Sequence, residues 1–125
     1  MNKQIINTEK APSAIGPYSQ GTQWESLIFT SGQLPIDMAT GAFPEGIEAQ
    51  TKQSIENVKA ILEAAGSSLD KVLKTTVFIK DMNDFGKVNE VYASYFNTDC
   101  PARSCIEVAR LPKDALVEIE VIAHQ

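Results

Sequence analysis

The chain has 125 residues, of which 43% are hydrophobic and 22% are charged, and this composition is typical of one folded domain rather than of a disordered chain. Its 11 Lys and Arg residues are outnumbered by 16 Asp and Glu residues, and no stretch concentrates the basic ones, so a nucleic-acid partner is not expected. The sequence also lacks an apolar run of signal-peptide or membrane-spanning length, so we expect a single cytoplasmic domain, residues 1–125, without membrane contact.

The first half of the chain predicts a β-hairpin followed by a long helix. Residues 26–31 are rich in β-forming side chains and end at Gly32, and residues 19–24 are the expected partner strand. From residue 47 to residue 65, apolar side chains recur at steps of three and four, which is the period of an amphipathic helix. Gly66 stands where such a helix is expected to end.

The middle of the chain predicts another strand and a second helix. Residues 72–80 alternate in polarity, as a strand with one buried face does. That face is predicted to carry Leu73, Thr75, Val77 and Ile79. Asn83 or Asp84 is expected to cap the helix, which ends near Asn97. The apolar stripe of this helix consists of Phe85, Val88, Tyr92 and Tyr95.

The last quarter of the chain predicts two more strands, residues 103–109 and 116–123. Because the connection through residues 111–114 is short, we expect these strands to form an antiparallel hairpin with one core face. By alternation, the core face carries Ser104, Ile106, Val108, Val117, Ile119, Val121 and Ala123. The other face carries Arg103, Cys105, Glu107, Leu116, Glu118, Glu120 and Ile122.

Taken together, these elements predict an α+β fold in which two helices cover one face of a mixed sheet. The face without helices is expected to carry Leu116, Ile122, Phe78 and Val72 among charged residues. A surface this apolar is unfavourable in water, and we therefore expect oligomerisation to cover it.

A charged cluster on the predicted hairpin is the first candidate site. Glu107 is expected roughly opposite Glu118, and two such carboxylates repel each other unless one is protonated or a cation lies between them. Arg103 is the nearest cation on that face. The pattern therefore indicates either a partly buried functional site or a structural ion pair at a subunit interface.

Short motifs occur along almost the whole chain. They are Ile15-Gly16-Pro17-Tyr18, Thr30-Ser31-Gly32-Gln33, Gln53-Ser54-Ile55-Glu56-Asn57-Val58, Lys74-Thr75-Thr76-Val77-Phe78, Pro101-Ala102-Arg103-Ser104-Cys105, Leu111-Pro112-Lys113 and Val117-Glu118-Ile119-Glu120. In identity and order they closely resemble the motifs of the reactive intermediate deaminase (RidA) family. One departure is the stretch 97–100, which is shorter than in many relatives and has Cys100 where they often carry an aromatic residue.

The resemblance implies a chorismate-mutase-like fold assembled as a homotrimer, with sites in the clefts between subunits. Members of this family hydrolyse 2-imino acids, the tautomers of the enamines that pyridoxal-phosphate-dependent dehydratases release from serine or threonine. The products are a 2-keto acid and ammonia. The resemblance implies no metal and no cofactor for this reaction.

The resemblance also implies roles for particular residues. Arg103 would bind the substrate carboxylate, and the planar guanidinium suits this task because it offers two parallel donors. Glu118 would orient the attacking water and move protons. Cys105 would act through its backbone near the imine nitrogen. Further residues that match pocket positions and would shape the cleft or bind substrate are Tyr18, Ser31, Gly32 and Asn89.

Several of these residues have a plainer interpretation. Cys105 is a candidate nucleophile, but the only histidine, His124, is nearly terminal, so a buried bystander thiol is favoured. The alternative for Tyr18 is packing at an interface, and the alternative for Asn89 is an ordinary exposed polar residue. One histidine and two cysteines at this spacing do not make a usual metal site.

Two other classes of function stay open at this point. One is a non-catalytic module that binds 2-keto acids or regulates through the same cleft. The other is the ribonuclease or chaperone-like activity reported for relatives, against which the net charge of -5 weighs.

Overall fold

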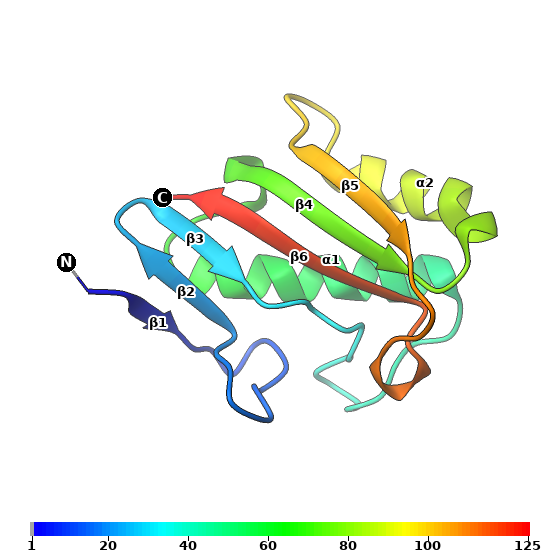
Figure 1. Cartoon of the computed structure of the whole chain (residues 1–125), viewed down its shortest axis with the longest axis horizontal. Helices are drawn as coiled ribbons and strands as arrows, with labels where there is room; N and C mark the ends of the chain where they lie inside the picture. The colour runs from blue at the N-terminus through cyan, green and yellow to red at the C-terminus, as the bar shows by residue number, and fades with distance from the viewer. Residues whose placement is uncertain (1) are drawn as a thin grey trace.

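The computed structural model describes residues 2–125 as one mixed six-stranded sheet with both helices packed on the same face (Figure 1). The elements are β1 (Gln4–Ile6), β2 (Gly21–Trp24), β3 (Leu27–Thr30), α1 (Ile47–Ala64), β4 (Val72–Ile79), α2 (Phe85–Tyr95), β5 (Ala102–Glu107) and β6 (Val117–His124). Their order across the sheet is β1-β2-β3-β6-β4-β5. The predicted α+β architecture is confirmed, and β1 is an additional strand that the sequence pattern does not indicate.

The two C-terminal strands do not form the predicted hairpin. β5 lies at the edge of the sheet, parallel to β4, and α2 makes the crossover between these two strands. β6 runs antiparallel between β3 and β4 (Figure 1). A parallel pair requires such a crossover, and the short turn at Pro112–Asp114 lies in the loop that returns the chain to the centre of the sheet.

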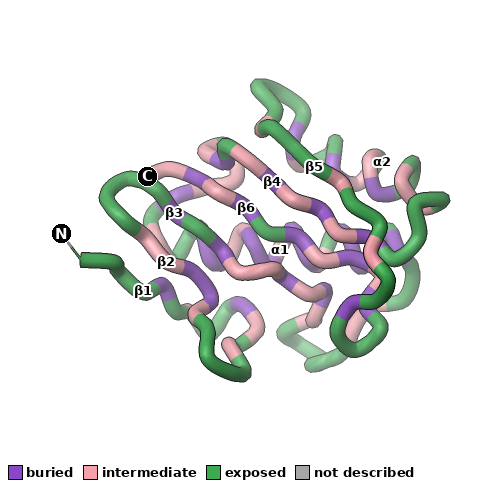
Figure 2. Tube along the Cα trace, in the orientation of Figure 1, coloured by how far each residue is buried: buried purple, intermediate pink, exposed green. Residues whose placement is uncertain are grey.

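Helix α1 packs its apolar stripe against the centre of the sheet, as its period predicts. Ile55 and Leu62 are buried in one cluster with Ile119 of β6. Figure 2 shows the buried stretches concentrated along α1 and the central strands. After the helix, Gly66 adopts a φ of 79°, a conformation that glycine accepts without strain, so the predicted helix end is confirmed.

Asn57 of α1 holds the loop that follows β3. This side chain is only 1% exposed, and its Nδ2 donates to the carbonyl oxygens of Leu34 and Ile36, each at 3.0 Å. Its Oδ1 accepts from Nε2 of Gln53 at 2.9 Å. Because the buried amide is fully satisfied, residues 34–36 are fixed against the helix.

Helix α2 begins at Phe85 with Asp84 at its N-cap position, as the sequence predicts, but the side chain that makes the capping hydrogen bond lies earlier in the chain. The capping side chain is Asp81, whose carboxylate accepts from the backbone N–H of Asn83 at 2.9 Å and starts a 3₁₀ turn. Asp84 precedes the α-helix without a capping hydrogen bond of its side chain. The helix ends at Tyr95 rather than at Asn97. Within the predicted stripe, Val88 and Tyr92 are buried.

A β-bulge changes the predicted faces at the start of β4. The register with β6 shifts between Val72 and Lys74, so Val72 is buried, and Leu73 is 47% exposed. Beyond the bulge, the predicted alternation is confirmed, with Thr75, Val77 and Ile79 buried.

The face of the sheet opposite the helices is open and apolar, as the sequence predicts. Phe29 and Ile106 are exposed there, and Phe78 and Ile122 are half-buried between them. Two residues predicted for this face lie elsewhere. Val72 belongs to the core cluster, and Leu116 packs against that cluster. Among the described residues, no helix has the length and apolarity of a membrane span.

Candidate functional site

The charged residues that the sequence places on one face lie on opposite faces of the sheet. Arg103 is in register with Thr75 of β4, which is buried under the helices, so Arg103 points to the helix side. Glu118 alternates with the buried residues of β6 and therefore points to the open face. The prediction that Arg103 and Glu118 share a face is wrong, because β5 pairs with β4 and not with β6.

Glu107 also differs from its predicted position. It is not opposite Glu118, because β4 separates their two strands. Its Oε1 accepts from the backbone N–H of Met82 at 2.7 Å, so it stabilises the turn that starts the second helical segment. Glu120 is exposed on the open face beyond Glu118. No pair of opposed carboxylates therefore arises from Glu107.

Arg103 lies against α2 and is restricted by three of its side chains. Its Nη1 donates to Oδ1 of Asn89 at 2.7 Å. Its guanidinium carbon lies 4.8 Å from the ring centre of Tyr92 and 5.3 Å from that of Phe85. Both rings attract the cation and limit its orientation, while the hydrogen bond is to a neutral amide that leaves the positive charge unneutralised. We call Arg103, Asn89 and Cys105 the arginine half-site.

Tyr92 is itself held in place by a hydrogen bond to β4. Its hydroxyl lies 2.8 Å from Oγ1 of Thr75, and both side chains are buried. Burial raises the pKa of the Tyr92 phenol, so the ring stays neutral beneath the guanidinium. The sequence pattern indicates Phe85 and Tyr92 only as core residues. Their second role depends on the parallel pairing of β5 with β4, which no local pattern reveals.

Cys105 is a free thiol whose environment favours the bystander interpretation. It is half-buried and packs against the core cluster beside Arg103 in β5. Burial raises the pKa of the Cys105 thiol, while the charge of Arg103 acts in the opposite direction with a smaller effect. The reactive thiolate is therefore disfavoured. Cys100 is also free, and it is exposed.

Glu118 is the centre of a second group of residues, on the open face. A Cβ atom added to Gly32 would lie 2.8 Å from the Glu118 carboxyl carbon, so this carboxyl group occupies the space that a side chain would need. Burial raises the pKa of Glu118, and the negative charge of Glu120 raises it further. The carboxyl group consequently holds its proton to a higher pH than an exposed glutamate does.

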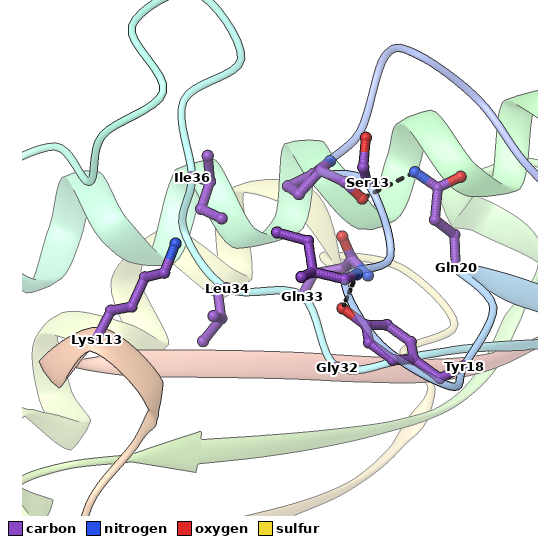
Figure 3. A pocket seen from close by; sticks show the side chains of 10 residues that line it. Ser13, Tyr18, Gln20, Gly32, Gln33, Leu34, Ile36 and Lys113 are labelled. Atoms are coloured by element: carbon purple, nitrogen blue, oxygen red, sulfur yellow. Dashed lines mark hydrogen bonds between the residues drawn. The ribbon is translucent and has the colours of Figure 1, made fainter.

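Ser31 and Tyr18 lie next to this contact. Oγ of Ser31 donates to the carbonyl oxygen of Ser19 at 2.5 Å, which ties the loop that contains Tyr18 to the end of β3. Tyr18 is 53% exposed. Figure 3 shows Tyr18 and Gly32 on one side of a pocket of about 260 Å³, with Lys113 on the other side. We call Glu118, Gly32, Ser31 and Tyr18 the glutamate half-site.

Replacing Gly32 by alanine is expected to displace the Glu118 carboxyl group while leaving the fold intact. The new methyl group would lie far inside the normal contact distance of that carboxyl group. We expect turnover to fall at least tenfold, measured as kcat/KM on the substrate proposed below. Gly86→Ala is the matched control, because Gly86 is helical and its added methyl meets no atom within 4 Å. Equal activity of the two variants would contradict the proposed importance of this contact.

The structure thus brings the predicted site residues together in two groups rather than in one. Arg103, Asn89 and Cys105 lie on the helix side at the edge of the sheet, and the glutamate half-site lies on the other side. Within residues 2–125, no three His, Cys, Asp or Glu side chains gather in a way that could hold a metal ion. A single copy of the chain therefore presents the candidate residues as two separate groups.

The family described as endoribonuclease L-PSP matches residues 8–125 of this chain. The 2-iminobutanoate/2-iminopropanoate deaminase of Salmonella typhimurium is 58% identical over 123 residues, which are 96% of each protein. A RutC family protein of Pyrococcus abyssi is 56% identical and covers 100% of this chain and 99% of its own length. The crystal structure of Escherichia coli TdcF with bound serine has a TM-score of 0.94 and 51% identity, with 98% of each chain covered.

Proposed function

The chain belongs to the endoribonuclease L-PSP family, in which the RidA-type deaminases are found, and we propose that it hydrolyses reactive 2-imino acids such as 2-iminobutanoate and 2-iminopropanoate. The family assignment from the sequence motifs is confirmed by these similarities. The proposed substrates are those named for relatives that are 55% and 58% identical to this chain. A dehydratase acting on serine or threonine would supply them as enamines.

The proposed reaction consumes one water molecule and needs no redox step. The protonated imine carbon accepts the water oxygen, which forms a tetrahedral carbinolamine. The C–N bond then breaks, the nitrogen leaves with the protons it needs as ammonium, and the carbon becomes the carbonyl of the 2-keto acid. Each step transfers protons and forms or breaks one bond to the imine carbon. A positioned water and a proton-transferring side chain therefore suffice for catalysis.

The observation that carries the proposal is the guanidinium of Arg103, which is already oriented and whose positive charge is not neutralised. Asn89 and two aromatic rings hold it in one orientation on an exposed surface, and its other donors stay available. A guanidinium in this state suits a planar carboxylate, which it binds through two parallel hydrogen bonds. Binding the substrate carboxylate there would place the imine carbon at a fixed distance from the protein surface.

Glu118 is the proposed proton-transferring group. To act on a substrate bound at Arg103, this glutamate would have to come from a second copy of the chain. Arg103 and Glu118 of one copy lie on opposite sides of the sheet, so a complete site would combine the arginine half-site of one copy with the glutamate half-site of its neighbour. Two different surfaces would then meet, and such a heterologous contact forms a closed ring when the rotation between neighbouring copies closes. We propose a homotrimer as this ring, with the apolar open faces covered inside it.

The pH dependence of the rate should report the ionisation of Glu118. Because burial raises the pKa of this carboxyl group, the basic form is lost at a higher pH than in an exposed glutamate, whose pKa is about 4.3. We expect kcat/KM, corrected for the uncatalysed reaction, to fall on the acid side with an apparent pKa above that value. Glu120→Gln should move this limb to lower pH, because the Glu120 charge contributes to the shift. A limb unchanged in Glu118→Gln would contradict the assignment.

The proposal is tested with a coupled assay in which a threonine dehydratase generates the intermediate in the presence of this protein. Keto-acid release should accelerate with wild-type protein, and Glu118→Gln should abolish most of the acceleration. Binding of 2-ketobutyrate, measured by calorimetry, should largely survive in Glu118→Gln. Binding without any acceleration by the wild-type protein would instead identify a non-catalytic module.

A further inference from the structure

A pocket of about 410 Å³ adjoins Arg103 and is separate from the pocket beside Tyr18. It lies between α2 and the segment that precedes β5. Its lining residues are Asn89, Tyr92, Ala93, Phe96, Cys100, Pro101 and Arg103. Its volume is within the range of pockets that hold small molecules.

The polar groups of this pocket lie at the arginine and the remaining wall is apolar. Arg103 and Asn89 are hydrogen-bonded to each other at one end. Tyr92 and Phe96 form an aromatic pair with ring centres 4.7 Å apart. Sγ of Cys100 donates to the carbonyl oxygen of Phe96 at 3.3 Å, so the hydrogen bond of this thiol is made to the pocket wall itself. A ligand whose carboxylate binds Arg103 would therefore find an apolar recess beside its anchored end.

We propose that this pocket receives the side chain of the 2-imino acid and that Cys100 determines how large that side chain can be. This inference rests on the proposed deaminase function. A methyl or ethyl side chain is small for a pocket of about 410 Å³, whereas the side chains of imines derived from leucine, methionine or phenylalanine would bury more apolar surface against its wall. Each further methylene buried there improves binding about fourfold.

Cys100 is the residue that leaves this space open. It is small and exposed, and it follows directly on residues 97–99, which form the outer loop between α2 and β5. A phenylalanine at this position would extend its ring toward Phe96 and Arg103 and fill the recess. The anchor would stay, because the hydrogen bond and the ring contacts of Arg103 involve α2 and not Cys100.

The test compares kcat/KM for imines generated in situ by an L-amino acid oxidase, with catalase present, from alanine, 2-aminobutyrate, leucine and methionine. The wild-type protein is expected to use the leucine and methionine imines at least tenfold better than the alanine imine. Cys100→Phe is expected to reverse this preference by lowering kcat/KM for the two larger imines at least tenfold, with little change for alanine. Cys100→Ala keeps the recess open and should keep the wild-type preference.

Thr98→Phe is the matched control, because it adds the same ring to the same loop at an exposed position that does not line the pocket. It should behave as wild type. An unchanged ratio of large to small substrates in Cys100→Phe would overturn the inference, as would turnover of the small imines alone by wild-type protein; in both cases the proposed deaminase function stands. Absence of turnover on every imine would overturn the proposed function together with this inference.

Discussion

Arg103→Lys is expected to lower kcat/KM for 2-iminobutanoate about 10-fold to 100-fold although it keeps the positive charge. Lysine offers one point charge in place of two parallel donors, so the substrate carboxylate would lose one charge-assisted hydrogen bond, which contributes about 1.5–3 kcal/mol. The planar stacking on Phe85 and Tyr92 would be lost as well. Arg103→Ala removes both hydrogen bonds, and we expect it to lose about 10²–10⁴-fold. The coupled dehydratase assay measures both variants.

The loss must be shown to come from substrate binding and not from unfolding. Arg103 is exposed on an edge strand, so neither variant should lower the melting temperature by more than a few degrees. Arg110→Lys is the matched control, because Arg110 is an exposed arginine in the loop after β5, outside both half-sites. Wild-type rates in Arg103→Lys would show that bidentate recognition by this residue is not needed, and the carboxylate anchor would have to be sought elsewhere.

The sequence predicts the helices and the layer arrangement well, because their signals are local. The stripe of α1 recurs over several turns, and Gly66 marks its end, so both the element and its buried face follow from the residue order. The strand β4 is equally clear, since Thr75, Val77 and Ile79 alternate with half-buried residues. The open apolar face follows from the same alternation in β4 and β6.

The arrangement of the site could not be predicted, because it depends on which strands are neighbours. Alternation shows that Arg103 and Cys105 share a face, but in an edge strand that is exposed on almost every residue it does not show which face is toward the core. A short connection after β5 suggests a hairpin with β6, whereas the crossover through α2 makes β5 the parallel partner of β4. This one difference in pairing moves Arg103 to the other side of the sheet from Glu118.

The placement of the two half-sites on opposite faces of the sheet supports assembly of several copies more specifically than the apolar face alone. An exposed apolar face is unfavourable in water, but it does not determine which partner covers it, since any hydrophobic surface of matching shape could do so. Two half-sites on opposite faces add a geometric requirement, because the positive group of one copy and the acidic group of another must meet for both to act on one small substrate. That requirement predicts behaviour that no single chain can show.

Mixing two inactive variants is therefore expected to restore activity. Arg103→Ala and Glu118→Gln, each inactive alone, would be unfolded together and refolded at equal concentrations so that mixed assemblies form. If every site takes Arg103 from one copy and Glu118 from its neighbour, random assembly leaves both native residues in about one quarter of the sites, and about one quarter of wild-type activity should return. The measurement is keto-acid release, with native mass spectrometry to verify that mixed assemblies are present.

The control for this experiment is a mixture of Arg103→Ala with the double variant Arg103→Ala/Glu118→Gln. No chain in that mixture carries the arginine, so no arrangement of copies assembles a complete site, although the subunits mix equally well. Activity confined to the first mixture would locate the site between copies and assign one residue to each side. If mixed assemblies form and stay inactive in both mixtures, Arg103 and Glu118 do not serve one shared site, since their positions on opposite faces already separate them within a single chain.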